Sequence, residues 1–257
     1  MTTPFDNVAE IYDRIRPSYP DALFDELFAQ LPARPAIVEI GPATGQATRS
    51  LLERGATVTA VEAGTKLGAF LHEKFTGVPA LEVLNAKFEA AHLAEAAFDA
   101  VVAATSFHWI DPSVRLAKSH RLLRDGGLLA VVATNQIRST ADRGYFDRSQ
   151  AIYRRHLPDE EPPGELEGEG VEPPEVAEFR ASRLFRDVHL SRYRWDQTYK
   201  TADYADLMRS YSNMQEMEPG PREALIAELC DFIDAEFDGY VVRPLVITLT
   251  SARKSSG

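Results

Sequence analysis

The sequence predicts an α/β protein with a doubly wound, mostly parallel sheet of seven strands and helical cap elements. Three observations support this fold class. Short apolar segments alternate with amphipathic helical segments between residues 36 and 134, which is the pattern of consecutive strand–helix–strand units. A turn with two glycines joins the first apolar segment to the helix that follows it. Two further strand-like segments lie after residue 185 and bring the expected number of strands to seven.

The first half of the chain alternates regularly. Helical spacing extends over residues 5–31 and is broken by Pro17 and Pro20. The expected strands are then residues 36–40, 57–62, 81–84, 98–104 and 128–134, and the expected helices between them are residues 46–54, 66–76 and 113–123. Gly55 stands where a helix C-terminal glycine belongs. The sequence Asp125-Gly126-Gly127 predicts a turn before the fifth strand.

The second half is less regular. Residues 158–176 are rich in Asp and Glu and contain no Lys or Arg, which predicts a solvated, mobile acidic loop; metal binding is the alternative, but no ligand spacing supports it. Helices are expected at residues 141–156, 202–214 and 222–237, and strands at 188–199 and 240–252. We therefore expect four parts: N-terminal cap helices (1–34), a ligand-binding core (35–135), a helical insertion with the acidic loop (136–184), and acceptor-side helices with the last strands (185–257).

Composition excludes several classes of partner. The net charge of −11 and the lack of a basic stripe oppose binding to nucleic acid, and no apolar run approaches the roughly 20 residues that span a bilayer. The first ten residues show no signal-peptide pattern. The single cysteine, Cys230, excludes an intrachain disulfide, fits a reducing cytoplasm and is expected to be a small buried hydrophobe. The scattered histidines predict no metal site. The oligomeric state stays open.

The glycine turn between the first strand and its helix is the most informative segment. Gly41 and Gly45 lack a Cβ, which should let the backbone approach a ligand, and the helix start offers unpaired N–H groups. Glu62 ends the second strand, so strand, turn, helix, strand and acid form a nucleoside-binding unit. The spacing Gly-x-x-x-Gly differs from the Gly-x-Gly-x-x-Gly of dinucleotide sites. This difference favours S-adenosylmethionine over NAD.

Several segments in order resemble the class I S-adenosylmethionine-dependent methyltransferases, and in particular the small-molecule branch that includes trans-aconitate methyltransferase-like proteins. The resemblance is strong over about residues 5–135. Many relatives have Gly-x-Gly where this chain has Gly41-Pro42-Ala43-Thr44-Gly45. The segments that carry the resemblance are Tyr12–Pro20, Val38–Gly45, Val58–Glu62, Phe98–Ile110 and Leu122–Val132. The resemblance implies a Rossmann-like methyltransferase fold and S-adenosylhomocysteine as a product.

The expected cofactor-binding residues follow from strand ends and from this resemblance. Glu62 should accept hydrogen bonds from ribose hydroxyls. Glu39, inside an apolar strand, should lie near the cofactor's amino group or the turn amides, or have a structural role. Phe88 could cover the adenine or belong to the core, and Arg16 could meet a carboxylate or only pack. The full set is Tyr12, Arg16, Glu39, Gly41, Gly45, Glu62, Ala63, Lys87, Phe88, Ala104 and Thr105.

The acceptor side is harder to read. His108 is the candidate catalytic residue, as a general base, an orienting group or a structural imidazole. The candidate substrate-binding residues, for which core packing is the alternative, are Tyr19, Phe107, Trp109, Trp195 and Tyr211. The expected function is methyl transfer to a small molecule by direct displacement. The alternatives are a non-catalytic S-adenosylmethionine-binding scaffold and a nucleotide-dependent oxidoreductase.

Overall fold

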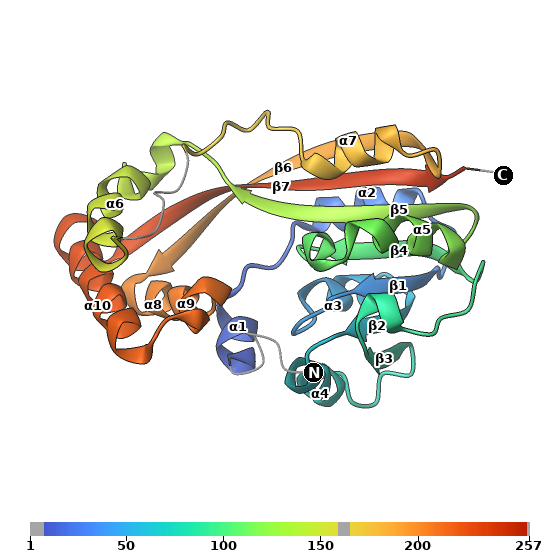
Figure 1. The fold of residues 1–257 in the computed structure, drawn as a ribbon, viewed down its shortest axis with the longest axis horizontal. Coiled ribbons are helices and arrows are strands. Elements are labelled where there is room, and N and C mark those ends of the chain that lie inside the picture. The colour runs from blue at the N-terminus through green and yellow to red at the C-terminus, as the bar shows by residue number, and fades with distance from the viewer. Residues whose placement is uncertain (1–7, 159–164, 256–257) are drawn as a thin grey trace.

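A seven-stranded sheet with the order β3-β2-β1-β4-β5-β7-β6 forms the centre of the molecule (Figure 1). The computed structural model describes residues 8–158 and 165–255. Strands β1 to β5 are parallel, whereas β7 is antiparallel to both β5 and β6. The predicted fold class is therefore confirmed. The strands are β1 (Ala36–Ile40), β2 (Thr57–Glu62), β3 (Leu81–Asn85), β4 (Phe98–Ala104), β5 (Leu123–Gln136), β6 (Phe185–Lys200) and β7 (Tyr240–Lys254).

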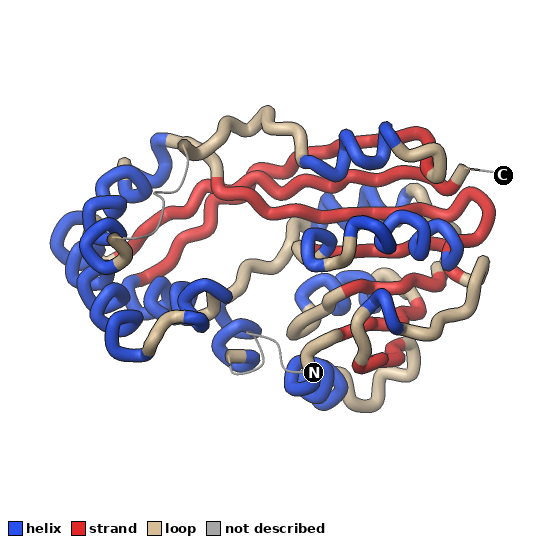
Figure 2. The backbone as a smooth tube through the Cα atoms, viewed as in Figure 1, coloured by secondary structure: helices blue, strands red, loops and turns tan. Residues whose placement is uncertain are grey.

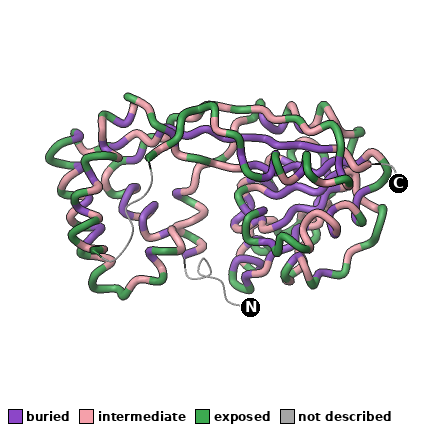
Figure 3. The backbone as a smooth tube through the Cα atoms, turned by 45° about the horizontal axis from the view of Figure 1, so that its top comes forward, coloured by how far each residue is buried: buried purple, intermediate pink, exposed green. Residues whose placement is uncertain are grey.

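Helices cover both faces of the sheet, which explains why the central strands are almost continuously apolar. On one face, α2 (Asp21–Ala29), α3 (Gln46–Glu53) and α4 (Thr65–Lys74) pack Phe24, Leu51 and Leu71 against the strands. On the other face, α5 (Pro112–Leu122) and α7 (Pro174–Ala181) close a second core. The central strands between these two helical layers are largely buried (Figure 3). Short 3₁₀ helices occur at Phe88–Ala90, Phe107–Trp109 and Thr140–Asp142.

A separate group of helices lies beyond the end of the central sheet, where β6 and β7 extend past the other strands (Figure 2). It contains α6 (Tyr145–His156), α8 (Thr201–Arg209), α9 (Ser212–Glu216) and α10 (Pro219–Glu236), which share a third core around Leu225, Leu229 and Phe237. No helix in the described part of the chain is long and apolar enough to cross a membrane.

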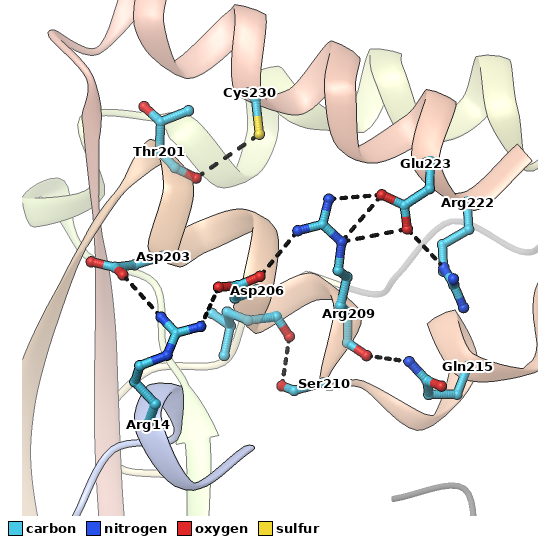
Figure 4. A network of polar contacts seen from close by, with 11 residues as sticks. Arg14, Thr201, Asp203, Asp206, Arg209, Ser210, Gln215, Arg222, Glu223 and Cys230 are labelled. Atoms are coloured by element: carbon cyan, nitrogen blue, oxygen red, sulfur yellow. Dashed lines mark hydrogen bonds and ion pairs between the residues drawn. The ribbon is translucent and has the colours of Figure 1, made fainter. Parts of the chain in front are cut away.

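The first described helix, α1 (Ala9–Ile15), bridges the two parts of the molecule. Arg14 points to two carboxylates of α8, with Nη2 2.6 Å from Asp206 and Nη1 3.8 Å from Asp203 (Figure 4). On its other side, Asp13 pairs with Lys74 of α4. This helix therefore connects α4, which packs on the sheet, to α8 of the helical group by ion pairs on its two sides.

Two predicted boundaries were wrong. The Asp125-Gly126-Gly127 turn lies within β5, where the pairing register to β4 jumps between Leu123 and Leu128, and the positive φ of Gly126 (72°) accommodates this bulge. The single helix expected at 202–214 is two helices that are interrupted at Ser210 and Tyr211. Arg16 donates to both the carbonyl (2.9 Å) and the hydroxyl (3.0 Å) of Ser210, so that carbonyl has a partner outside the helix.

The predicted acidic loop is correct only in part. Asp159, Glu160 and Glu161 lie outside the described residues. Residues 165–172 are mostly exposed, but Glu169 pairs with Arg194. Residues from Pro174 onward form α7, in which Glu175 is buried and lies near the hydroxyl of Thr250 (3.3 Å). Cys230 is only partly buried, and its thiol faces the carbonyl of Thr201 at 3.9 Å.

Candidate functional site

A cavity of about 450 Å³ opens at the carboxyl ends of β1, β2 and β4. We call it the strand-end cavity. Ligands of open α/β sheets bind at this edge, where neighbouring connections diverge to opposite faces. Helix α1 and the segment that begins α9 form the opposite wall. The predicted site residues that line it are Tyr12, Arg16, Tyr19, Glu39, Gly41, Glu62, Ala63, Lys87, Phe88, Ala104, Thr105, His108, Trp109 and Tyr211.

Glu62 ends β2 and is held in place by backbone groups. Its Oε2 accepts from the N–H of Ala43 (3.0 Å), and its Oε1 accepts from the N–H of Gly64 (2.7 Å). The side chain is only 5% exposed, yet it lines the cavity. Each carboxylate oxygen can accept a further hydrogen bond. Glu62 therefore fixes the turn after β1 and also presents acceptors to the cavity.

Glu39 is the second carboxylate of the cavity, and it is 1% exposed. Its Oε2 accepts a 2.6 Å hydrogen bond from the hydroxyl of Thr48. Its Oε1 has no hydrogen-bond partner within residues 8–158 and 165–255. Burial raises the pKa of Glu39 to about 7, although the hydrogen bond from Thr48 opposes the shift. A buried acceptor that lacks a protein partner is a place for a ligand donor.

The two glycines of the turn make room for other side chains of the protein. A Cβ on Gly41 would come within 2.7 Å of the Ser106 side chain, and a Cβ on Gly45 would come within 2.6 Å of the Phe75 ring. Both glycines have positive φ, 64° and 89°. The missing Cβ atoms therefore allow side chains of the protein itself to pack closely. Gly41 still lines the cavity, whereas Gly45 does not.

Arg16 and two tyrosines form the wall opposite the strand ends. The Arg16 guanidinium lies 4.8 Å from the ring centroid of Tyr12 and 4.5 Å from that of Tyr211. Burial raises the pKa of Tyr12, with the positive charge of Arg16 acting in the opposite direction. Because Arg16 is fixed by Ser210, it places a positive charge at a defined point of this wall.

Thr105 follows β4 in a strained backbone conformation. Its φ is 56°, in the left-handed region that β-branched residues rarely adopt. Its hydroxyl lies 3.0 Å from the hydroxyl of Tyr19, and its N–H donates to the carbonyl of Val132. Strain of this kind persists where the surroundings fix it, and it occurs often at ligand sites. The arrangement ties the segment before α2 to the end of β4.

His108 lies in the 3₁₀ helix after β4 and lines the cavity. Its ring centroid is 5.0 Å from that of Trp109, which is 63% exposed. Burial, together with the positive charge of Arg115, lowers the pKa of His108. The imidazole is therefore neutral at neutral pH and has a lone pair available.

Three predicted site residues lie outside the cavity. Phe107 is 4% exposed and packs edge-to-face on Phe179 in the core under α7. Trp195 lies on β6, packs against the first core cluster, and donates to Gln197. Gly45 packs under α4, as described above. The alternating polarity of β6 does not show which face of the strand is turned toward the cavity. The prediction therefore assigned Trp195 to the site although its side chain packs on the core.

Several lining residues were not predicted. Ser106 donates to the carbonyl of Ile40 and so joins the ends of β4 and β1. Gln46 is at the first position of α3, and Ser212 follows the break between α8 and α9. Gln46 could have been found from its place directly after the glycine turn. Ser212 could not, because its place depends on the helix break.

Comparisons with known proteins agree with this geometry. Residues 38–131 match the family described as "methyltransferase domain". Uncharacterized methyltransferases of Mycobacterium bovis and Mycobacterium tuberculosis are 33% identical over 132 residues, which cover 51% of this chain and 52% of theirs. The chain thus spans about half the length of the curated relatives it matches.

Solved structures share the fold over most of the chain. The YcgJ protein of Bacillus subtilis is 15% identical with a TM-score of 0.57, over 92% of this chain and 99% of that protein. A phosphoethanolamine N-methyltransferase 2 of Haemonchus contortus, solved with phosphomonomethylethanolamine and S-adenosylhomocysteine, is 13% identical with a TM-score of 0.56, over 98% of this chain and 58% of that protein. Identities this low establish the fold alone. The family match thus covers residues 38–131, and the sheet order is the fold shared with these solved structures.

Proposed function

We propose that the protein is an S-adenosylmethionine-dependent methyltransferase that transfers a methyl group to a small-molecule acceptor by direct displacement. One observation carries the proposal most strongly. The strand-end cavity joins two nearly buried carboxylates, Glu39 near the end of β1 and Glu62 at the end of β2. The cofactor has hydroxyls and an ammonium group, and both need acceptors of this kind.

The lining residues support a placement of the cofactor in three parts. Glu62 would accept from the ribose hydroxyls, since its two oxygens are already oriented by backbone N–H groups. The unpartnered Oε1 of Glu39 would accept from the ammonium group. Phe88 and Lys87, after β3, would border the adenine. The cavity volume of about 450 Å³ lies within the range of small-ligand sites.

The acceptor would enter between the end of β4 and the wall formed by Tyr12, Arg16 and Tyr211. When bound, the cofactor would supply an activated methyl group on its sulfonium, which a lone pair of the acceptor would take while the carbon–sulfur electron pair stays on sulfur as a neutral thioether. Alignment of the acceptor supplies much of the rate. We assign His108 to orienting the acceptor. An acceptor that loses a proton could pass it to the neutral imidazole of His108, whereas a carboxylate has none to lose.

The finer assignments are supported by the sequence and by one solved neighbour. The placement in the branch that resembles trans-aconitate methyltransferase rests on the segments Tyr12–Pro20 and Phe98–Ile110. A cytoplasmic location is proposed from the single cysteine. A small-molecule acceptor is supported by the net charge of −11 and by the neighbour that was solved with phosphomonomethylethanolamine.

Calorimetry and a transfer assay test the proposal together. The protein should bind S-adenosylmethionine and not NAD, and methyl-labelled cofactor should label a member of a panel of small acids, phenols and amines. Tight NAD binding without S-adenosylmethionine binding would indicate an oxidoreductase. Cofactor binding with no transfer to any member of a broad panel would favour a non-catalytic scaffold.

A further inference from the structure

A second cavity, of about 370 Å³, lies between α6, the break after α8, and the extended parts of β5 and β7. We call it the helix-side cavity. Its wall contains tyrosines, methionines, amide side chains and two arginines, Arg154 and Arg243, and no Asp or Glu among the described residues that line it. In a chain with a net charge of −11, a wall without acids and with two cations is unusual. The strand-end cavity, in contrast, is lined by the carboxylates Glu39, Glu62 and Glu89 as well as by the cations Arg16 and Lys87.

Arg243 of β7 is the central polar group of the helix-side cavity. Its Nε and Nη2 donate to the Oε1 of Gln136, at 3.2 and 2.6 Å, and its Nη1 donates to the hydroxyl of Tyr211. These acceptors are uncharged, and the described residues give Arg243 no carboxylate within ion-pair distance. A guanidinium has five N–H donors, so three hydrogen bonds leave two donors for a ligand. A partly buried cation without an anion is an unfavourable arrangement that a bound anion would correct.

Phenolic hydroxyls add neutral donors around this guanidinium. Tyr145, Tyr153 and Tyr204 line the cavity, and burial raises the pKa of each, so all three keep their protons. The rings of Tyr145 and Tyr204 meet edge to face with centroids 5.4 Å apart. Met208 and Met214 complete an apolar surface beside the rings. The cavity therefore offers hydrogen-bond donors at one point and an apolar, partly aromatic surface around it.

Tyr211 connects the two cavities, because it lines both of them. At the helix-side cavity its hydroxyl accepts a hydrogen bond from Arg243. At the strand-end cavity the guanidinium of Arg16 lies over its ring. The break between α8 and α9 places Tyr211 at this boundary. A molecule held by Arg243 would thus lie next to the place where the methyl group is expected.

We propose that the helix-side cavity binds a small organic anion, a carboxylate or a phosphate ester with an apolar or aromatic body, and that this anion is the methyl acceptor. The part that concerns methylation rests on the proposed function, whereas the part that concerns anion binding does not. The planar guanidinium of Arg243 suits two-point recognition of carboxylate or phosphate. The tyrosine and methionine side chains would then select anions whose apolar or aromatic part fits the rest of the cavity.

The test measures binding of trans-cinnamate, phenyl phosphate and the uncharged cinnamamide by calorimetry, with and without S-adenosylmethionine. The wild type should bind at least one of the two anions more tightly than the amide. Arg243→Gln should weaken that binding by about 10- to 100-fold, because charge-assisted hydrogen bonds are lost, while the affinity for S-adenosylmethionine stays unchanged. Arg253→Gln is the matched control, because Arg253 is on the same strand and lines neither cavity, and its hydrogen bonds within residues 8–158 and 165–255 go to the carbonyls of Gly126 and Gln30.

The outcomes distinguish failure of the anion-binding inference from failure of the proposed methyltransferase function. Equal affinity for the amide and both anions, or an Arg243→Gln protein that binds the anion as the wild type does, overturns the inference even when S-adenosylmethionine binds. Failure of S-adenosylmethionine to bind, with anion binding intact, contradicts the proposed function instead. If Arg243→Gln does not fold, Arg243→Lys is used instead, which keeps the positive charge but loses the planar guanidinium with its paired donors. That variant should bind the anion more weakly and still prefer it to the amide, and loss of the preference overturns the inference.

Discussion

Glu39 links the stability of the fold to pH in a way that one substitution can isolate. Its carboxyl is 1% exposed, and its pKa is about 7 in the folded protein against 4.5 as the ordinary value. A carboxyl with a raised pKa favours folding when it is protonated and opposes folding once it ionises. Its favourable contribution is therefore complete below about pH 4.5 and is lost as the pH rises toward and through 7.

The size of the effect follows from that shift. Each pKa unit corresponds to about 1.36 kcal/mol, so the full shift corresponds to about 3 kcal/mol. Between pH 5 and pH 8 the wild type should lose about 2–3 kcal/mol of unfolding free energy relative to Glu39→Gln, whose side chain does not ionise. For a chain of this size that is about 5–10 °C in melting temperature. Glu39→Gln should thus be the more stable protein at pH 8, and should bind S-adenosylmethionine more weakly because the ammonium group loses a charged partner.

Thermal melts of the cofactor-free proteins at pH 5, 6, 7 and 8 measure this difference directly. The comparison uses the difference between the two proteins, because all other titrating groups are common to both. Glu82→Gln is the control, since Glu82 is an exposed acid on the neighbouring strand β3. Melting temperatures of wild type and Glu39→Gln that stay parallel across the range would refute the reasoning.

Three further predictions concern the strand-end cavity. Glu62→Ala should weaken S-adenosylmethionine binding by about one to two decades, because charge-assisted hydrogen bonds of about 1.5–3 kcal/mol are lost and partly replaced by water. Glu82→Ala is the reference variant. An unchanged dissociation constant in folded Glu62→Ala would remove Glu62 from the site. His108→Ala should raise KM for the acceptor more than it lowers kcat, whereas loss of an acidic limb in the pH–rate profile would show that His108 is a general base. Gly45→Ala should lower the melting temperature more than Gly77→Ala does, because both have positive φ but only a Cβ at position 45 meets other atoms; equal melting temperatures would show that this contact is easily relieved.

The sheet could be predicted because its signals are local. Each of the first five strands is a short apolar run next to a helix with clear spacing, and the Val38–Glu62 unit carries both the turn and the acid. Even there the reason given for Gly41 was incomplete. Its missing Cβ makes room for Ser106, which comes from a strand end more than sixty residues away, and no local pattern shows that contact.

The wall of the strand-end cavity opposite the strand ends could be predicted only in part, because its positions depend on tertiary contacts. The helix break that brings Tyr211 and Ser212 to the cavity coincides with the hydrogen bonds that Arg16 makes to Ser210, across nearly the whole length of the chain. Arg243 carried no signal in the sequence, because an arginine near the start of a strand normally faces solvent. Its role becomes visible only when Gln136 and Tyr211 are placed around it.

The long strands β6 and β7 also determine how the molecule can move. Their antiparallel ladder shifts register once, between Arg186 and His189, and then continues from His189 paired with Ser251 to Lys200 paired with Tyr240, so it joins the central sheet to the helical group without an intervening loop. Rigid-body closure needs a few residues that absorb large backbone rotations, and a continuous ladder lacks them. Opening of the cavity should then depend on α1, whose ion pairs to α8 and α4 are weakened by salt. Hydrogen exchange that becomes faster in residues 9–15 at high ionic strength, while residues 188–200 stay protected, would identify the small helix as the moving part and the ladder as the stiff one.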